Sequence, residues 1–140
     1  MMQMEWDFTR HALLAGAMDD AHQVSIRLIR RLALAADADE PLCLEQLLLH
    51  CEEHFMQEKA WMDDSAMPLS ERHLRDHAAI HAMLINARDE LRAGKAGAGR
   101  KLGTELFALF DRHFATYDAA LALCMLQKRH AAGPGIPAVG

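Results

Sequence analysis

Apolar side chains recur every three or four positions through four long stretches of this 140-residue chain. This spacing collects them on one face of an α-helix, whereas in a strand they would alternate. The clearest repeat predicts a helix from about Pro41 to Asp63 or Asp64, and its stripe contains Leu44, Leu47, Leu48, Cys51, His54, Phe55, Glu58 and Met62. Two ionisable side chains, a histidine and a glutamate, therefore share the apolar face of this helix.

The same repeat predicts three further helices. They are expected from a start between His11 and Met18 to about Ala36, from about 70 to 93, and from about 100 to 129. Pro41 and Pro68 mark the start of the second helix and the turn before the third, because proline opens helices and does not continue them. Helices of this length joined by short loops predict an all-α fold, an up-down-up-down antiparallel four-helix bundle.

The two ends of the chain are expected to differ from the bundle. Residues 1–10 predict an extended lead-in, in which Trp6 and Phe8 can pack over the helices. The bundle domain is expected to span 1–130. Residues 131–140 combine prolines and glycines with few side chains able to build a core, so they are predicted to form a flexible tail.

Composition supports this fold class and narrows the function. Leu, Ala and Met are abundant, a bias that favours helix over strand. The formal charge of −5 argues against a nucleic-acid partner, which needs a basic surface. No apolar run is long enough to cross a bilayer, and the N-terminal residues do not resemble a signal peptide, so neither a membrane partner nor secretion is expected. Three widely spaced cysteines indicate free thiols in a cytoplasmic protein.

The nine histidines need a further explanation. Each predicted helix places at least one candidate metal ligand on its inward face. In the order of the helices, these are His22, then His54 and Glu58, then His73 and His77, then His113 with Asp118. Burying so many ionisable groups without partners is costly, and a bound metal converts this cost into stabilisation. Five imidazoles and two carboxylates are too many donors for one ion and suit two transition-metal ions bridged by the carboxylates.

One spacing does not fit an ideal helix. Asp118 follows His113 by five residues, which is a rotation of about 140°, and Tyr117 instead continues the apolar stripe. Either Asp118 reaches sideways towards a seam between helices, or the helix widens locally as a π-bulge. Tyr117 is either a core residue or a hydrogen-bond donor to a ligand.

The remaining histidines are expected to lie outside the site. His50 and His81 each extend a ligand pair by one more turn, but eight residues of helix rise about 12 Å, too far for a compact centre. His11 and His130 fall near the ends of elements and are predicted to be solvated.

The order of the ligand motifs resembles that of the hemerythrin family, including the bacterial hemerythrin-like proteins. That family carries one histidine after acidic residues on the first helix, His-x-x-x-Glu on the second, His-x-x-x-His after a proline turn on the third, and His-x-x-x-x-Asp on the fourth. Here the motifs are Asp19-Asp20-Ala21-His22, His54 to Glu58, Pro68 followed by His73 and His77, and His113 to Asp118. The resemblance covers about residues 6–128.

The resemblance implies an oxo- or hydroxo-bridged di-iron centre. One iron would take His73, His77 and His113, the other would take His22 and His54, and Glu58 and Asp118 would bridge them. The second iron would keep an open position for O2. Phe110 and Phe114, which lie close to His113 in the sequence, would form dry walls of the O2 pocket.

Three functions remain open on this basis. Reversible O2 binding for transport, storage or sensing is favoured, because a nitrogen-rich ligand shell stabilises high-valent iron less than a carboxylate-rich one. A di-iron enzyme that scavenges peroxide or nitric oxide is the first alternative, and an iron-storage or metal-binding module is the second. A ferritin-like oxidase is disfavoured, because the chain contains no Glu-x-x-His motif.

Overall fold

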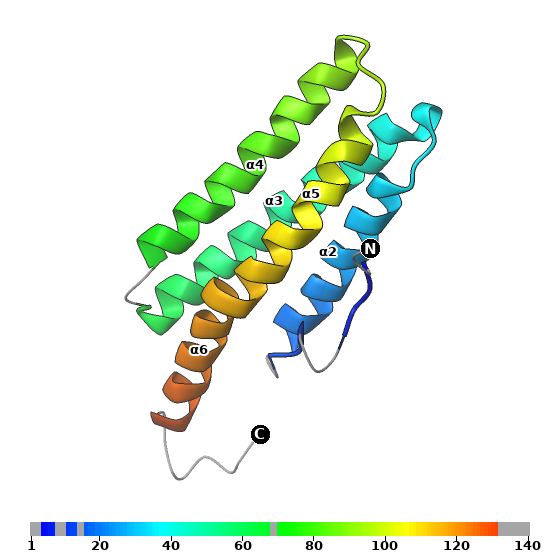
Figure 1. Ribbon diagram of the computed structural model, residues 1–140. Helices are drawn as coiled ribbons and strands as arrows, with labels where there is room; N and C mark the ends of the chain where they lie inside the picture. Colours follow the sequence, from blue (N-terminus) through cyan, green and yellow to red (C-terminus); the bar gives the residue numbers. More distant parts are fainter. Residues whose placement is uncertain (1–3, 8–10, 14–15, 68–69, 132–140) are drawn as a thin grey trace.

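The computed structural model describes residues 4–7, 11–13, 16–67 and 70–131. Within these residues, four helical rods lie side by side (Figure 1). They are α2 (Ala17–Ala33), α3 (Glu40–Ser65), α4 (Ser70–Arg92), and α5 (Ala98–His113), which continues through a π-helical turn (Phe114–Asp118) into α6 (Ala119–Ala131). A short 3-10 turn, Asp37–Asp39, precedes α3, and the described residues contain no strand.

Consecutive helices pack against one another, and α2 also packs against α5, so the bundle closes into a ring. α6 extends the fourth rod alongside α3 (Figure 1). This arrangement confirms the predicted all-α, up-down-up-down four-helix bundle. Among the described residues, every helix is too short or too polar to span a bilayer.

The first helix ends at Ala33, earlier than the predicted Ala36. Two contacts from α5 explain the difference. Gly103 passes so close to the end of α2 that a Cβ on Gly103 would lie 2.7 Å from the backbone nitrogen of Ala33. Beyond that contact, the guanidinium of Arg100 donates a hydrogen bond to the carbonyl oxygen of Ala35 (3.1 Å), which holds the chain in a loop.

A buried carboxylate fixes the start of α5. Glu40, the first residue of α3, is fully buried. It accepts hydrogen bonds from the backbone N–H groups of Gly97 (2.7 Å) and Arg100 (2.9 Å), and it pairs with the Arg100 guanidinium at 3.2 Å. A carboxylate in this place satisfies free N–H groups at the start of the helix and complements its dipole.

Two apolar clusters fill the bundle, and a layer of ionisable side chains separates them. The larger cluster includes Ile26, Ile29, Leu32, Leu44, Leu47, Phe55, Ile80, Leu84, Leu106, Phe107, Phe110 and Phe114. The smaller cluster contains Met18, Met62, Met67, Leu121 and Ala122. Along α2, Met18 belongs to the smaller cluster and Ile26 to the larger one, with the buried His22 between them.

The N-terminal lead-in contains one clear departure from prediction. His11 was expected to be solvated, but only 1% of its surface is exposed. Its Nδ1 accepts a hydrogen bond from the backbone N–H of Asp7 (2.9 Å), and its Nε2 lies 2.8 Å from Oδ1 of Asp111. Its ring also packs beside Trp6, with the centroids 5.3 Å apart. Polar partners on both ring nitrogens permit this burial, and the prediction of solvation was wrong.

Phe8 and Pro68 lie outside the described residues, as does the segment 132–140. The side chain of His130 is also outside the description. The packing of Phe8, the solvation of His130, the flexible tail and the domain boundary at 130 therefore stay predictions.

Candidate metal centre

The ionisable layer contains all seven side chains that the sequence nominated as metal ligands. Each is buried, with at most 5% of its surface exposed. They come from all four rods: His22 from α2, His54 and Glu58 from α3, His73 and His77 from α4, and His113 and Asp118 from the fourth rod. Their donor atoms form two groups, and within each group all donor atoms lie within 4.8 Å of one another.

The first group holds three imidazoles and both carboxylates. Nε2 of His113 lies 3.2 Å from Nε2 of both His73 and His77. Oε1 of Glu58 lies 2.8 Å from Nε2 of His77, and Oδ1 of Asp118 lies 2.8 Å from Nε2 of His73. Five donors thus surround one small volume.

The second group holds two imidazoles and the same two carboxylates. Oε2 of Glu58 lies 2.8 Å from Nε2 of His54, and Oδ2 of Asp118 lies 2.8 Å from Nε2 of His22. Each carboxylate therefore presents one oxygen to each group. A carboxylate that bridges two cations needs this arrangement.

Several of the short contacts in the layer are not hydrogen bonds. Both oxygens of Asp118 lack a hydrogen-bond partner, although each lies 2.8 Å from an imidazole Nε2. Such contacts arise when the lone pairs of the two atoms point to a shared third position. Ligands at right angles around an ion, with bonds of about 2.1 Å, lie about 3 Å apart. The observed separations of 2.8 and 3.2 Å match this spacing, so the donor set fits a metal ion in each group.

The carboxylates and imidazoles of the layer shift one another's pKa. Burial lowers the pKa of His113, but the adjacent carboxylates of Asp118, Asp76 and Glu58 outweigh it and raise that pKa to about 11. Burial also lowers the pKa of His22, and the adjacent Asp118 and Glu58 raise it to about 9. Burial raises the pKa of Glu58, yet the surrounding histidines bring it well below its ordinary value. Carboxylates that stay ionised when buried are suited to holding cations.

The π-helical turn accounts for the spacing of His113 and Asp118. The backbone N–H of Ala119 bonds to the carbonyl oxygen of Phe114, five residues earlier. The turn is therefore one residue wider than an α-helical turn. It leaves Asp118 fully buried beside His113, with Oδ1 of the first 3.1 Å from Nε2 of the second. Of the two explanations that the sequence left open, local widening is correct.

Aromatic rings cover one side of the layer. Phe114 stacks on His22 with the ring centroids 3.9 Å apart, and Phe55 stacks on His77 at the same separation. Phe110 packs edge-on against Phe114 at 5.6 Å. All three phenylalanines are buried, so the donors face a dry wall on this side.

His50 and His81 belong to neither donor group among the described residues. Nε2 of His50 lies 2.9 Å from Oγ of Ser25 and 3.1 Å from the carbonyl oxygen of Ala21. His81 pairs with Glu52 at 2.8 Å on the surface. Both histidines thus have partners of their own, one turn away from the layer.

Sequence reasoning missed one residue that touches the site. Asp76 lies between the two histidines of α4, and its Oδ2 is 2.5 Å from Nδ1 of His113. Its place directly before His77 was the available signal, but its partner is 37 residues away in the chain. Tyr117 packs its ring 5.5 Å from the rings of both His73 and His113, so it is a packing neighbour of the layer.

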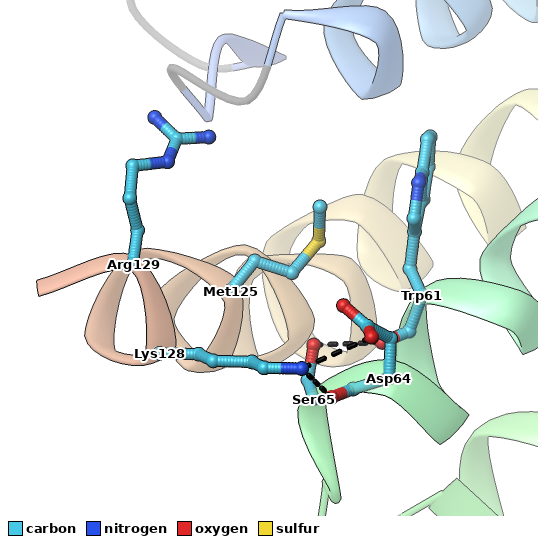
Figure 2. A pocket seen from close by; sticks show the side chains of 6 residues that line it. All are labelled: Trp61, Asp64, Ser65, Met125, Lys128 and Arg129. Carbon is cyan, nitrogen blue, oxygen red and sulfur yellow. Dashed lines mark hydrogen bonds and ion pairs between the residues drawn. The ribbon is translucent and has the colours of Figure 1, made fainter. Parts of the chain in front are cut away.

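The described residues line several cavities on the surface of the bundle, including the following two. The larger, of about 330 Å³, is lined by Asp76, Leu109, Arg112, His113, Thr116 and Tyr117, and it brings solvent up to the layer. The other, of about 270 Å³, lies between α3 and α6 and contains none of the seven donors (Figure 2). Its lining residues are Trp61, Asp64, Ser65, Met125, Lys128 and Arg129.

Comparison with known proteins agrees with the family resemblance of the sequence. The chain is 29% identical over 128 residues to a protein named Bacteriohemerythrin from Ralstonia nicotianae, and the match covers 91% of this chain and 93% of that protein. No family model matches the chain. A solved crystal structure of a leucine-to-phenylalanine mutant, 18% identical, aligns with a TM-score of 0.79 over 89% of this chain and 98% of that one, which shows the fold alone. The curated relative and the four motifs in order relate this chain to the hemerythrin family.

Proposed function

We propose that the ionisable layer holds two iron ions and that the protein binds O2 reversibly at this centre. The observation that carries the proposal is the division of the donors into two groups that share Glu58 and Asp118. The relationship to the hemerythrin family supports iron as the metal.

In this proposal His73, His77 and His113 would hold one iron, and His22 and His54 would hold the other. Glu58 and Asp118 would be shared by both ions, because each takes part in both donor groups. The first group offers five protein residues and the second offers four, so the two-histidine group leaves more room for an external ligand. The iron ions supply the electrons that O2 binding requires.

The walls of the layer favour a small ligand. Phe114 stacks on His22 of the two-histidine group, and Phe110 packs against Phe114 in turn. Buried aromatic walls admit a small apolar molecule and exclude water and larger substrates. This environment suits a diatomic ligand such as O2 better than an organic substrate.

The test is an optical spectrum of iron-loaded, reduced protein recorded without oxygen, after admission of air, and after removal of the air. Reversible O2 binding predicts a charge-transfer band that appears with air and disappears on deoxygenation. Irreversible oxidation with consumption of added peroxide would indicate a scavenging enzyme, and iron in large excess over two ions per chain would indicate storage. Failure of the reconstituted protein to retain iron would reject the di-iron centre.

A further inference from the structure

Asp76 is a partly exposed carboxylate that contacts a buried histidine of the layer. Its Oδ2 lies 2.5 Å from Nδ1 of His113, on the side of the ring opposite the nitrogen that faces the donor group. The Asp76 side chain is 36% exposed, and it lines the 330 Å³ cavity with Arg112 and Tyr117. An aspartate at such a partly exposed position is ionised at neutral pH.

Three other imidazoles of the layer have no such support. The Nδ1 atoms of His22, His54 and His73 are buried without a hydrogen-bond partner. His113 differs from them because a carboxylate accepts a hydrogen bond from its outer nitrogen. That bond keeps a proton on Nδ1 and leaves the lone pair of Nε2 free to bind a metal.

We propose that Asp76 is a positioning residue that fixes the tautomer and orientation of His113 and, through its negative charge, strengthens His113 as a metal ligand. This inference rests on the proposed function. A carboxylate on the outer nitrogen makes an imidazole more basic, and a more basic ligand stabilises the higher oxidation state of iron. Asp76 would therefore lower the reduction potential of the iron held by His73, His77 and His113. It would do so from the solvent-facing cavity that it lines.

Asp76→Asn separates charge from shape, since the amide oxygen can still accept a hydrogen bond from Nδ1–H. We expect the iron-loaded Asp76→Asn protein to have a more positive reduction potential and iron affinity weakened about tenfold. Asp76→Ala also loses the acceptor, so its affinity should fall further, by up to roughly 100-fold. Asp76→Glu restores the charge and should move both quantities back towards the wild-type values. Spectroelectrochemical titration measures the potential, and competition with a chelator measures the affinity.

Asp111→Asn is the matched control. Asp111 also pairs with a buried histidine, at 2.8 Å, and its exposure of 38% is similar. That histidine, His11, belongs to neither donor group. The control should therefore keep the wild-type potential and iron affinity.

Three results would overturn the inference. Wild-type potential and affinity in both Asp76→Asn and Asp76→Ala, while His113→Ala loses iron, would reject the role of Asp76 and leave the proposed centre intact. Loss of stability in metal-free Asp76→Asn without a change of potential would mark a structural role instead. If His113→Ala itself keeps its iron, the proposed centre is wrong as well.

Discussion

Glu40 and Asp118 are both fully buried carboxylates, but their surroundings satisfy them differently. Glu40 accepts hydrogen bonds from the backbone of Gly97 and Arg100 and pairs with the Arg100 guanidinium, so the protein itself balances its charge. Asp118 lies 2.8 Å from two imidazoles, and neither of its oxygens has a hydrogen-bond partner. Burial alone therefore does not identify a metal ligand. The direction of the neighbouring donors distinguishes a structural carboxylate from one placed for a cation.

Substitution of Glu58 is expected to cause the largest loss of iron and of stability, because Glu58 takes part in both donor groups. We expect Glu58→Ala protein to lose most of its iron, together with the stabilisation that iron gives the wild type, about 4 kcal/mol when free iron is near 1,000 times its Kd. Thermal unfolding with and without iron, and the iron content per chain, measure this. Glu53→Ala, at an exposed position of α3, is the control and should match the wild type. Iron-dependent stabilisation of the Glu58→Ala protein would contradict a bridging role.

A smaller loss of iron affinity is expected from substitution of His77, and His81, one turn further along α4, provides the control. His77→Ala removes a donor from one group only, and we expect its iron affinity to fall by more than the roughly 10- to 100-fold typical of residues that merely support a ligand. His81→Ala should bind iron like the wild type, because His81 pairs with Glu52 at the surface. Chelator competition compares the two variants. Equal losses would mean that the face assigned to α4 is wrong.

Glu40→Gln should affect stability and spare the metal. We expect a loss of about 2 kcal/mol in the free energy of unfolding, less than for a fully buried ion pair, because Arg100 is partly exposed. Urea denaturation of the metal-free protein measures the loss, and iron content should equal that of the wild type. A variant that loses iron in proportion to stability would show that the two carboxylate sites are not independent.

The final prediction concerns pH rather than a substitution. The pKa of His22 is raised from 6.5 to about 9 in the folded protein, so the folded state binds this proton more tightly than the unfolded chain does. The stability that results is complete below about pH 6.5 and is lost as the pH rises towards about 9. Metal binding has the opposite dependence, because it needs neutral imidazoles.

Urea denaturation across this pH range should therefore show declining stability for the metal-free protein and no such decline for the iron-loaded protein. Stability of the metal-free protein that rises over the same range would mean that Asp118 and Glu58 do not hold His22 in its protonated form.

Local periodicity was sufficient to predict the four helices and to identify six of the seven candidate donors, because these six continue apolar stripes at helical spacing. Asp118 is the exception. Its spacing was compatible with either a side chain that reaches sideways or a π-bulge in the helix. Helix geometry alone does not distinguish these two alternatives. The choice depends on packing from both sides of the fourth rod: Phe114 stacks on His22, and Leu121 packs in the smaller apolar cluster.

The roles of residues whose partners are distant in the chain could not be predicted from a local sequence pattern. His11 looked solvated because it lies near the end of an element, but Asp111, 100 residues away, balances its burial. Asp76 had no role assigned from the sequence, and only the packing of α4 against α5 brings it to His113. In both cases a contact between distant segments decides the role of the residue, and such contacts exist only in the folded chain.

The extra residue of the π turn also affects the rod beyond it. Each residue of an α-helix adds about 100° of rotation, so the face that α6 turns towards α3 depends on the widened turn before it. Leu121 and Ala122, which share a cluster with Met62, owe their inward orientation to the same irregularity that places Asp118. Deletion of this residue would displace both the candidate ligand Asp118 and one end of the core. The π turn therefore matters both for the donor groups, through Asp118, and for the packing of the core, through Leu121 and Ala122.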